Sequence, residues 1–328
     1  MRLLVLGGTG FVGGAVAARA VARGHQVTCA ARGKSGSVPD GAVHVPVDRD
    51  GPDGLAALAG STFDAVVDIA PMSYPWVADA LELLAPSAGH WTFVSTVNVY
   101  ADNETQGQRP DAPLLEPLRE SRGDDDEIDP NRYGAIKVAS ENAVRETMGE
   151  KAFVVRPGLI TGPADRSDRF GYWPGRFARG GRVVVPDSPD QPIQIIDVRD
   201  LADWIVDAGE RGTTGTYDGI GPISTLGQTL RGIAELVGGD AELVPVAAEK
   251  LTEAGINYYG GPTSLPLWLP PSHWGMKSHD PQPSLDAGMP VRPLADTVAG
   301  ALATERELGL DRPRRSGLSL EEEAAILA

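Results

Sequence analysis

Three evenly spaced glycines that follow an apolar run near the first residue constrain the fold more than any other feature. Residues 3–6 are all apolar, which is typical of a buried strand in a parallel sheet. Gly7, Gly10 and Gly13 come next, and residues 12–23 then have the pattern of a helix without proline. Glycine lets the backbone turn sharply and approach a pyrophosphate, whose charge is favoured by the N-terminal end of a helix. This order predicts one half of a dinucleotide-binding unit.

Further apolar runs alternate with helical patterns along the chain. We expect strands over 25–31, 43–47, 64–70, 91–95 and 152–157, and helices over 76–84, 133–148, 200–209, 224–237 and 291–308. The alternation predicts an α/β fold with a Rossmann-type, doubly wound parallel sheet. Ligands of such a sheet lie at the carboxyl ends of its strands.

The charge balance limits the classes of partner. The chain carries 45 acidic and 29 basic side chains, a formal net charge of −16. That charge disfavours binding to nucleic acid or to an anionic membrane, but it leaves room for one local basic pocket that takes a phosphate. The single cysteine, Cys29, lies in an apolar strand and favours a reducing compartment. With no signal-peptide pattern and no apolar run of about 20 residues, we expect a cytoplasmic protein outside the membrane.

The residues after the second expected strand indicate which dinucleotide is bound. An acidic residue there binds the 2′-hydroxyl of NAD, whereas an arginine accommodates the 2′-phosphate of NADP. The chain has Arg32, Lys34 and Ser35 and no carboxylate, so we expect NADP, with NAD as the alternative. A solvated basic turn would have the same composition. Asp48, after the third strand, is expected near the adenine, and Asp68 is expected to be a hydrogen-bonded structural carboxylate.

Tyr133 and Lys137 lie four residues apart in an expected helix and therefore share one face. A free tyrosine has a pKa of about 10, which is too high for acid–base catalysis at neutral pH. A nearby ammonium favours the phenolate and lowers that pKa. Ser95 and Thr96, at the carboxyl end of the 91–95 strand, are expected beside the nicotinamide half of such a site. The alternative is a tyrosine and a lysine that merely share a surface.

Two groups of residues have the composition of a metal site without its spacing. We expect the carboxylates of residues 124–127 to form a solvated loop. His273 and His279 are not spaced to meet on one helix turn and have no cysteine partner. We therefore expect no metal.

Taken together, these motifs resemble the extended short-chain dehydrogenase/reductase superfamily, of the kind grouped as NAD-dependent epimerases/dehydratases. The segments that carry the resemblance are residues 7–13, 95–96, 133–137, 156–158 and 197–202. The resemblance implies that Thr96 hydrogen-bonds the substrate oxygen and that Tyr133 transfers the proton. Lys137 would hold the nicotinamide ribose and lower the tyrosine pKa. It also implies a cofactor-binding core over 1–160 and a smaller substrate-binding domain over 161–328, with residues near 190–210 returning to the core.

The resemblance further implies two sets of contact residues. The cofactor set is Gly7, Thr9, Gly10, Phe11, Val12, Gly13, Arg32, Lys34, Ser35, Asp48, Ala70, Ser95, Tyr133, Lys137, Pro157, Gly158 and Ile160. The substrate set is Asn98, Arg169, Tyr172, Trp173 and Gln194. Arg169, Tyr172 and Trp173 belong to residues 165–174, a stretch that is both polar and aromatic and therefore suits a substrate loop.

Departures from the family pattern bear on the substrate. The segment between Thr96 and Tyr133 is longer than usual, so a loop is inserted beside the site. Residues 192–197 lack the arginine with which nucleotide-sugar members contact the diphosphate, which disfavours a UDP- or TDP-sugar. Dehydratases carry an acidic residue next to the active hydroxyl, where this chain has Val97 and Asn98, which disfavours dehydration.

These observations predict an NADP-dependent oxidoreductase that acts on a carbonyl or alcohol carbon of a small metabolite, sugars included. A sugar epimerase or dehydratase shares the first chemical step and is the alternative. An alternative of another class is a non-catalytic cofactor-binding sensor or an RNA-associated protein, because the chain is also similar to an atypical subgroup that contains chloroplast stem-loop RNA-binding proteins. The acidic charge and the Tyr133–Lys137 pair disfavour the RNA role. A homodimer is left open.

Overall fold

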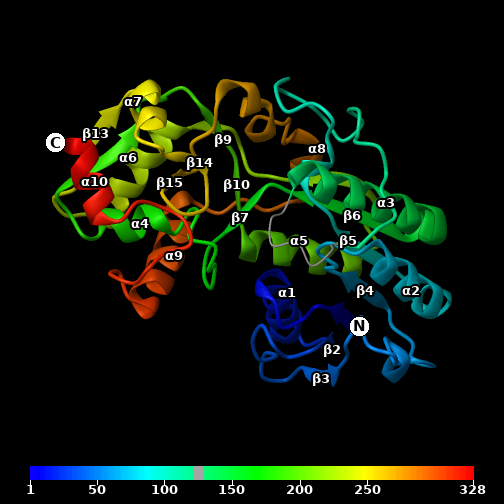
Figure 1. Ribbon diagram of the computed structural model, residues 1–328. Helices are drawn as coiled ribbons and strands as arrows, with labels where there is room; N and C mark the ends of the chain where they lie inside the picture. Colours follow the sequence, from blue (N-terminus) through cyan, green and yellow to red (C-terminus); the bar gives the residue numbers. More distant parts are fainter. Residues whose placement is uncertain (122–128) are drawn as a thin grey trace.

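A seven-stranded parallel sheet forms the centre of the first lobe in the computed structural model, which describes residues 1–121 and 129–328 (Figure 1). The strand order is β11-β6-β5-β4-β1-β2-β3, and every neighbouring pair is parallel. The strands are β1 (Arg2–Leu6), β2 (Gln26–Ala31), β3 (Val43–Pro46), β4 (Ala65–Asp68), β5 (Trp91–Val94), β6 (Ala152–Pro157) and β11 (Gly215–Gly219). The predicted doubly wound Rossmann-type sheet is confirmed.

Helices cover both faces of this sheet, which explains why its strands are continuously apolar. Leu3 and Val5 of β1 face one core, together with residues of α1 (Phe11–Ala22) and α5 (Val198–Arg211). Leu4 and Leu6 face the opposite core, together with α2 (Tyr74–Leu84) and α3 (Pro130–Met148). Successive strand residues point to opposite faces, so one strand supplies two cores. Since α5 packs against α1, the chain returns to the first lobe after leaving it.

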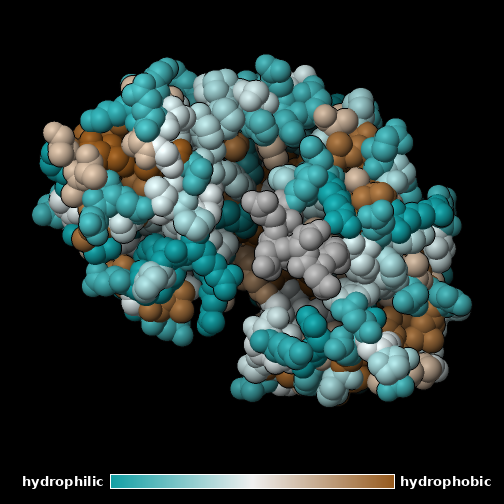
Figure 2. All heavy atoms as spheres, viewed as in Figure 1, coloured by the Kyte–Doolittle hydropathy of each residue, from teal (hydrophilic) through white to brown (hydrophobic). Residues whose placement is uncertain are grey.

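A second lobe has its own hydrophobic core, drawn from residues 159–327 (Figure 1). Its strands pair two by two and are β7 (Leu159–Thr161), β10 (Ile195–Asp197), β8 (Arg182–Pro186), β13 (Glu242–Val246), β9 (Pro192–Ile193), β12 (Ser224–Thr225), β14 (Asn257–Tyr259) and β15 (Ser264–Pro266). The later helices are α4 (Tyr172–Phe177), α6 (Leu226–Val237), α7 (Ala248–Glu253), α8 (Gln282–Asp286), α9 (Leu294–Leu308) and α10 (Leu320–Leu327). A hollow separates this lobe from the first over part of the face in Figure 2.

Tight packing fixes the helix that carries the Tyr133–Lys137 pair. Asn98 belongs to a short 3₁₀ helix, η3 (Val97–Val99), which follows β5. A Cβ atom added at Gly134 would lie 2.0 Å from the Asn98 carbonyl oxygen, so glycine lets α3 contact that segment directly. Among the described residues, no helix is both long enough and apolar enough to cross a membrane.

Candidate functional site

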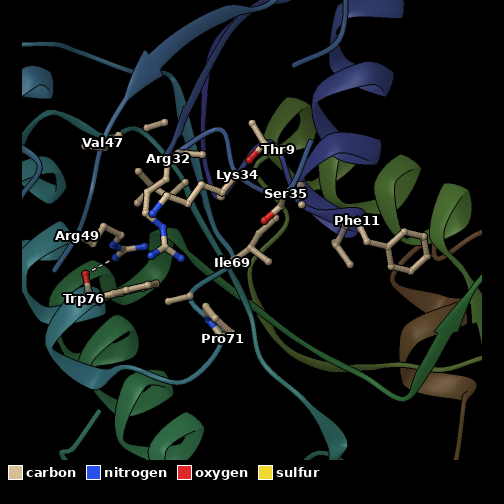
Figure 3. A pocket seen from close by; sticks show the side chains of 18 residues that line it. Thr9, Phe11, Arg32, Lys34, Ser35, Val47, Arg49, Ile69, Pro71 and Trp76 are labelled. Atoms are coloured by element: carbon tan, nitrogen blue, oxygen red, sulfur yellow. Dashed lines mark hydrogen bonds between the residues drawn. The ribbon is translucent and has the colours of Figure 1, made fainter. Parts of the chain in front are cut away.

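The glycine turn between β1 and α1 forms one end of a cavity of about 350 Å³ (Figure 3). A Cβ atom at Gly13 would lie 2.2 Å from the Gly7 carbonyl oxygen, so only glycine permits this close turn. A Cβ atom at Gly10 would meet nothing nearer than the same oxygen at 3.5 Å. Gly10 is also the N-cap of α1 and has no side chain to accept the first helical N–H groups. Those donors remain available to an anion.

The predicted cofactor residues that line this cavity are Gly7, Thr9, Gly10, Phe11, Val12, Gly13, Arg32, Lys34, Ser35 and Ala70. Val47, Arg49 and Trp76 were not predicted and line it too, at the end opposite Phe11 in Figure 3. Arg49 donates a 2.9 Å hydrogen bond to Asp68 and another to the Trp76 carbonyl oxygen, and its guanidinium lies 5.3 Å from the centre of the Trp76 ring. Asp68 is fully buried, as expected of a structural carboxylate.

Arg32 and Lys34 differ from Arg49 because neither forms an ion pair within the described part of the chain. Both are exposed, and their charges are free to meet a phosphate. Asp48 does not line the cavity: its carboxylate accepts a hydrogen bond from the Asp50 backbone N–H, 3.3 Å away, in an exposed turn. Its neighbours Val47 and Arg49 line the cavity, so the proximity of Asp48 to an adenine stays a prediction.

A second cavity, of about 680 Å³, lies between the two lobes and shares Phe11 with the first. The predicted residues that line it are Ser95, Thr96, Asn98, Tyr133, Pro157, Gly158, Ile160 and Arg169. Five other polar side chains line it that were not predicted to bind cofactor or substrate: Asn103, Asn131, Tyr259, His273 and Lys277. Asn131 lies in the first turn of α3 and the others lie in loops and short elements without a recognisable motif, so only their meeting in space identifies them.

Tyr133 is held as a neutral phenol. Burial raises the pKa of Tyr133 above its usual value, while a hydrogen bond with Thr96 and the charge of Arg169 oppose that rise. Thr96 in turn caps η3: its hydroxyl oxygen accepts the Asn98 backbone N–H at 3.2 Å. The hydroxyl and the phenol therefore meet in the cavity, as the family resemblance implies.

Lys137 is engaged by backbone carbonyls in this structure, and its effect on the pKa of Tyr133 stays a prediction. Its ammonium donates hydrogen bonds to the carbonyl oxygens of Ala70 at 2.5 Å and Val94 at 2.7 Å, and it lies 4.5 Å from the centre of the Phe93 ring. Ala70 follows β4 and Val94 ends β5, so Lys137 connects α3 to the carboxyl ends of these two strands. Burial lowers the pKa of Lys137 to about 7, against the opposing charges of Asp68 and Glu141.

Ser95 belongs to a buried polar network that runs through the first lobe. Its hydroxyl donates to Glu141 at 2.5 Å, and Glu141 pairs with Arg156 at 2.8 Å. Arg156 donates to the Tyr100 hydroxyl at 3.0 Å. Ser95 lines the second cavity, but its hydroxyl is already engaged in joining the end of β5 to α3.

Three predicted substrate residues lie outside the cleft. Tyr172 and Trp173 are 1% and 0% exposed and form part of the core of the second lobe. Gln194 is 1% exposed, and its amide bonds to the backbone of Gly221 and His279. Tyr172 and Trp173 were expected in a loop, but they are the first two residues of the short helix α4, and both are buried. These three expectations are corrected.

No group of three or more potential metal ligands occurs in residues 1–121 and 129–328. His279 is buried against Asp218, with 3.0 Å between Nδ1 and the carboxylate, and His273 lies apart from it in the second cavity. The acidic run 124–127 lies outside the described residues. The two cavities, which share Phe11, fit a dinucleotide. They combine open N–H donors at a glycine turn, unpaired cations beyond β2 and a tyrosine–threonine pair in the second cavity.

Comparisons with known proteins agree with this geometry. The profile of the NAD dependent epimerase/dehydratase family matches residues 3–218. The chain is 27% identical over 216 residues to the chloroplast stem-loop binding protein of 41 kDa b from Arabidopsis thaliana. That alignment covers 61% of this chain and 53% of the relative, so the chain matches about half the length of the plant protein.

Solved structures with the same fold cover nearly the whole chain. The Bordetella bronchiseptica enzyme WbmH in complex with NAD⁺ is 19% identical at a TM-score of 0.65, covering 93% of this chain and 98% of its own. The human epimerase family protein SDR39U1 with NADPH is 21% identical at 0.63, covering 92% and 99%. UDP-N-acetylglucosamine 4-epimerase from Bacillus cereus is 16% identical at 0.69, covering 95% and 99%. At these identities the similarity establishes the fold.

Proposed function

The chain belongs to the NAD-dependent epimerase/dehydratase family, and on that premise we propose that it is an NADP-dependent oxidoreductase acting on a small metabolite. The reaction would reduce a carbonyl carbon or oxidise an alcohol carbon. The observation that carries the proposal is the meeting of Tyr133 and Thr96 in a cavity that shares Phe11 with the glycine-turn cavity. A nicotinamide cofactor supplies the hydride acceptor or donor when it is bound.

The chain's own residues would bind and orient the reactants. The N–H groups at the start of α1 suit the pyrophosphate, and Arg32 with Lys34 suits a 2′-phosphate. Trp76 offers a flat apolar surface at the far end of the first cavity for an adenine. Lys137 uses two of its three N–H groups on backbone carbonyls and keeps one for a ribose hydroxyl.

Proton transfer would fall to Tyr133. Because its pKa is raised, it is protonated at neutral pH and ready to donate to the oxygen of a carbonyl under reduction. Thr96 would hold that oxygen and stabilise the charge that develops on it.

A sugar epimerase is the second candidate, favoured by the similarity of the fold to several solved epimerases, among them a UDP-galactose 4-epimerase and a UDP-glucose 4-epimerase. The same tyrosine would remove a proton in the first half of that reaction and return it in the second. An RNA-associated role, suggested by the plant relative, is disfavoured by the net charge of −16. The acidic protein with one buried cysteine suits a reducing cytoplasm.

A screen of carbonyl compounds, monitored by nicotinamide absorbance, tests the proposal. We expect NADPH to be oxidised in the presence of at least one compound, and faster than NADH. Arg32→Ala should weaken NADPH binding by about tenfold or more and leave NADH binding nearly unchanged, since a charged hydrogen bond to the 2′-phosphate is lost. Equal losses for the two cofactors would contradict the NADP assignment. Reaction of a sugar epimer without net cofactor change would support the second candidate instead.

A further inference from the structure

Three segments of the second lobe bring two cations and a phenol to one wall of the second cavity. Arg169 lies in the loop between β7 and α4, Tyr259 ends β14, and Lys277 ends a 3₁₀ helix, η5 (Pro271–Lys277). All three line the cavity that also holds Tyr133 and Thr96. We call this group the cationic wall.

Lys277 is the most buried member of the cationic wall, at 3% exposure. Its ammonium donates to the Tyr259 hydroxyl oxygen at 3.1 Å and lies 5.0 Å from the centre of the Tyr259 ring. The Arg169 guanidinium lies 5.8 Å from the same ring, and its Nε donates to the Ser167 hydroxyl at 3.2 Å. Both cations therefore approach one tyrosine.

Neither cation has an ion-pair partner within the described ranges 1–121 and 129–328. The charge of Arg169 acts to lower the pKa of Asp165, but the two groups form no ion pair. A buried charge without a partner is costly to a folded protein. Lys277 is such a charge, and the half-buried Arg169 lies on the same cavity wall, so in a chain whose net charge is −16 the two cations call for a ligand.

The hydrogen-bond inventory indicates the chemistry of that ligand. An ammonium offers three donors, a guanidinium five and a phenol one. The acceptors in the wall are the Tyr259 and Ser167 hydroxyl oxygens, so most of the donors are unused. Only a group with several acceptor oxygens and a negative charge matches both the donors and the charge.

The backbone at Tyr259 is also special. Its φ is +64°, in the left-handed region, and its N–H donates to the Trp268 carbonyl oxygen at 2.9 Å. A bulky side chain seldom adopts this conformation, and residues held in it concentrate at ligand-binding sites. The ring that this backbone presents lies 5.0 Å from the Lys277 ammonium and 5.8 Å from the Arg169 guanidinium.

We propose that Arg169, Tyr259 and Lys277 bind an anionic group of the substrate, a carboxylate or a phosphate. This deepens the proposed function, on which it rests, because it names the substrate class: a carbonyl or alcohol compound that carries an acid group. Tyr133 and Thr96 line the same cavity as the cationic wall, so an anion on this wall shares the cavity with the reacting groups.

The protonation chemistry of Tyr259 agrees with this role. Burial raises the pKa of Tyr259, but the charges and hydrogen bonds of Lys277 and Arg169 outweigh it and bring that pKa below its ordinary value. The two cations therefore favour negative charge on an oxygen atom beside them, which is the property that an anion-binding wall needs.

Calorimetric binding to the NADP⁺-saturated protein tests the proposal with four probes: inorganic phosphate, glucose 6-phosphate, glucuronate and glucose. The three sugars share one ring and differ in carrying a phosphate, a carboxylate or neither. We expect at least one anionic probe to bind, with glucose weaker by about tenfold or more. Preference between glucose 6-phosphate and glucuronate identifies the acid group.

Variants of the wall decide whether these residues are responsible. Lys277→Met and Arg169→Gln should each weaken the anionic probes by about tenfold, while Lys277→Arg restores binding. Lys250→Met is the matched control, because Lys250 is exposed and bonds only the Ile326 carbonyl oxygen. The Lys250→Met variant should bind the anionic probes as tightly as the parent does, and melting temperatures confirm that each variant is folded. The proposal is overturned if the parent binds no anionic probe more tightly than Lys277→Met does.

The binding measurement separates this proposal from the proposed function. Tyr133→Phe should lose turnover and keep the anionic preference, whereas Lys277→Met should lose the preference and keep NADPH binding. Anion binding in a protein that turns over no carbonyl compound would uphold the wall and contradict the oxidoreductase.

Discussion

The cleft contains two tyrosine–lysine pairs whose electrostatics are opposite. Tyr133 and Lys137 are four residues apart on α3, yet the ammonium bonds to two backbone carbonyls and the pKa of the phenol is raised by burial. Tyr259 and Lys277 are far apart in sequence, yet the ammonium donates directly to the phenol oxygen and the pKa of Tyr259 is lowered. A shared helix face brings two side chains to the same side of a helix without joining their polar ends.

The difference suggests a division of labour. A neutral phenol near Thr96 suits the donation of a proton, and a phenol held between two cations suits the binding of a negative charge. Tyr133 and Lys137 both lie on α3, in the first lobe. The second pair is supplied wholly by the second lobe, so each lobe contributes one half of the substrate site.

The largest expected effect distinguishes the two phenols in turnover. Tyr133→Phe should lower kcat by about 100-fold or more, because the proton donor is removed, with NADPH affinity nearly unchanged. Tyr259→Phe should lower kcat by less than about tenfold and raise KM for an acidic substrate. Steady-state kinetics on the same compound measure both. Equal losses of kcat in the two variants would contradict the proposed difference between the two phenols.

A smaller effect concerns the two lysines and the stability of the protein. The folded pKa of Lys137 is about 7 and its ordinary value is 10.5, so the unfolded chain binds more protons between these limits. The free energy of unfolding should therefore rise with pH, by up to about 1.4 kcal/mol per unit for one proton. Above pH 9 Cys29 opposes this rise, because burial raises the pKa of its thiol to about 11 from 9.0.

Denaturant unfolding between pH 7 and 9 measures that slope. Lys137→Met should reduce it by most of one proton, whereas Lys277→Met should leave it as in the parent. A parent without a rising slope in this interval would show that Lys137 is charged in the folded state.

The smallest effect is spectroscopic. Tyrosinate absorbance of the parent should include an early transition, below the ordinary tyrosine pKa, that Tyr259→Phe removes. Tyr133→Phe should instead remove a late transition. Titrating the tyrosinate absorbance of each variant and subtracting it from that of the parent gives the order in which Tyr259 and Tyr133 ionise. The reverse order would contradict the assignment of charge in the cleft.

The parts of the site formed by consecutive residues were predictable from the sequence. The turn around Gly7–Gly13, the strand end at Thr96 and the Tyr133 helix depend on local backbone geometry that short motifs encode. The positions of their side chains were less predictable: Lys137 bonds to carbonyls because β4 and β5 end beneath it, which the spacing on α3 does not encode.

The site residues of the second lobe were not predictable from short motifs. Tyr259 and Lys277 come from short elements without periodicity, and they meet only because of the tertiary packing of segments far apart in the chain. The aromatic stretch with Tyr172 and Trp173 misled the sequence prediction, since it begins a short helix whose apolar residues fill the second core. Composition alone does not distinguish a substrate loop from the start of a buried helix.

Hydride transfer itself is most directly tested with NADPH that carries deuterium at the transferred position. The carbonyl compound identified by the screen is incubated with the labelled cofactor, and its product is examined by mass spectrometry. We expect one deuterium at the reduced carbon for each NADPH consumed, and about 100-fold slower incorporation with Tyr133→Phe. A product without deuterium, or incorporation that Tyr133→Phe does not slow, would contradict an oxidoreductase whose proton donor is Tyr133.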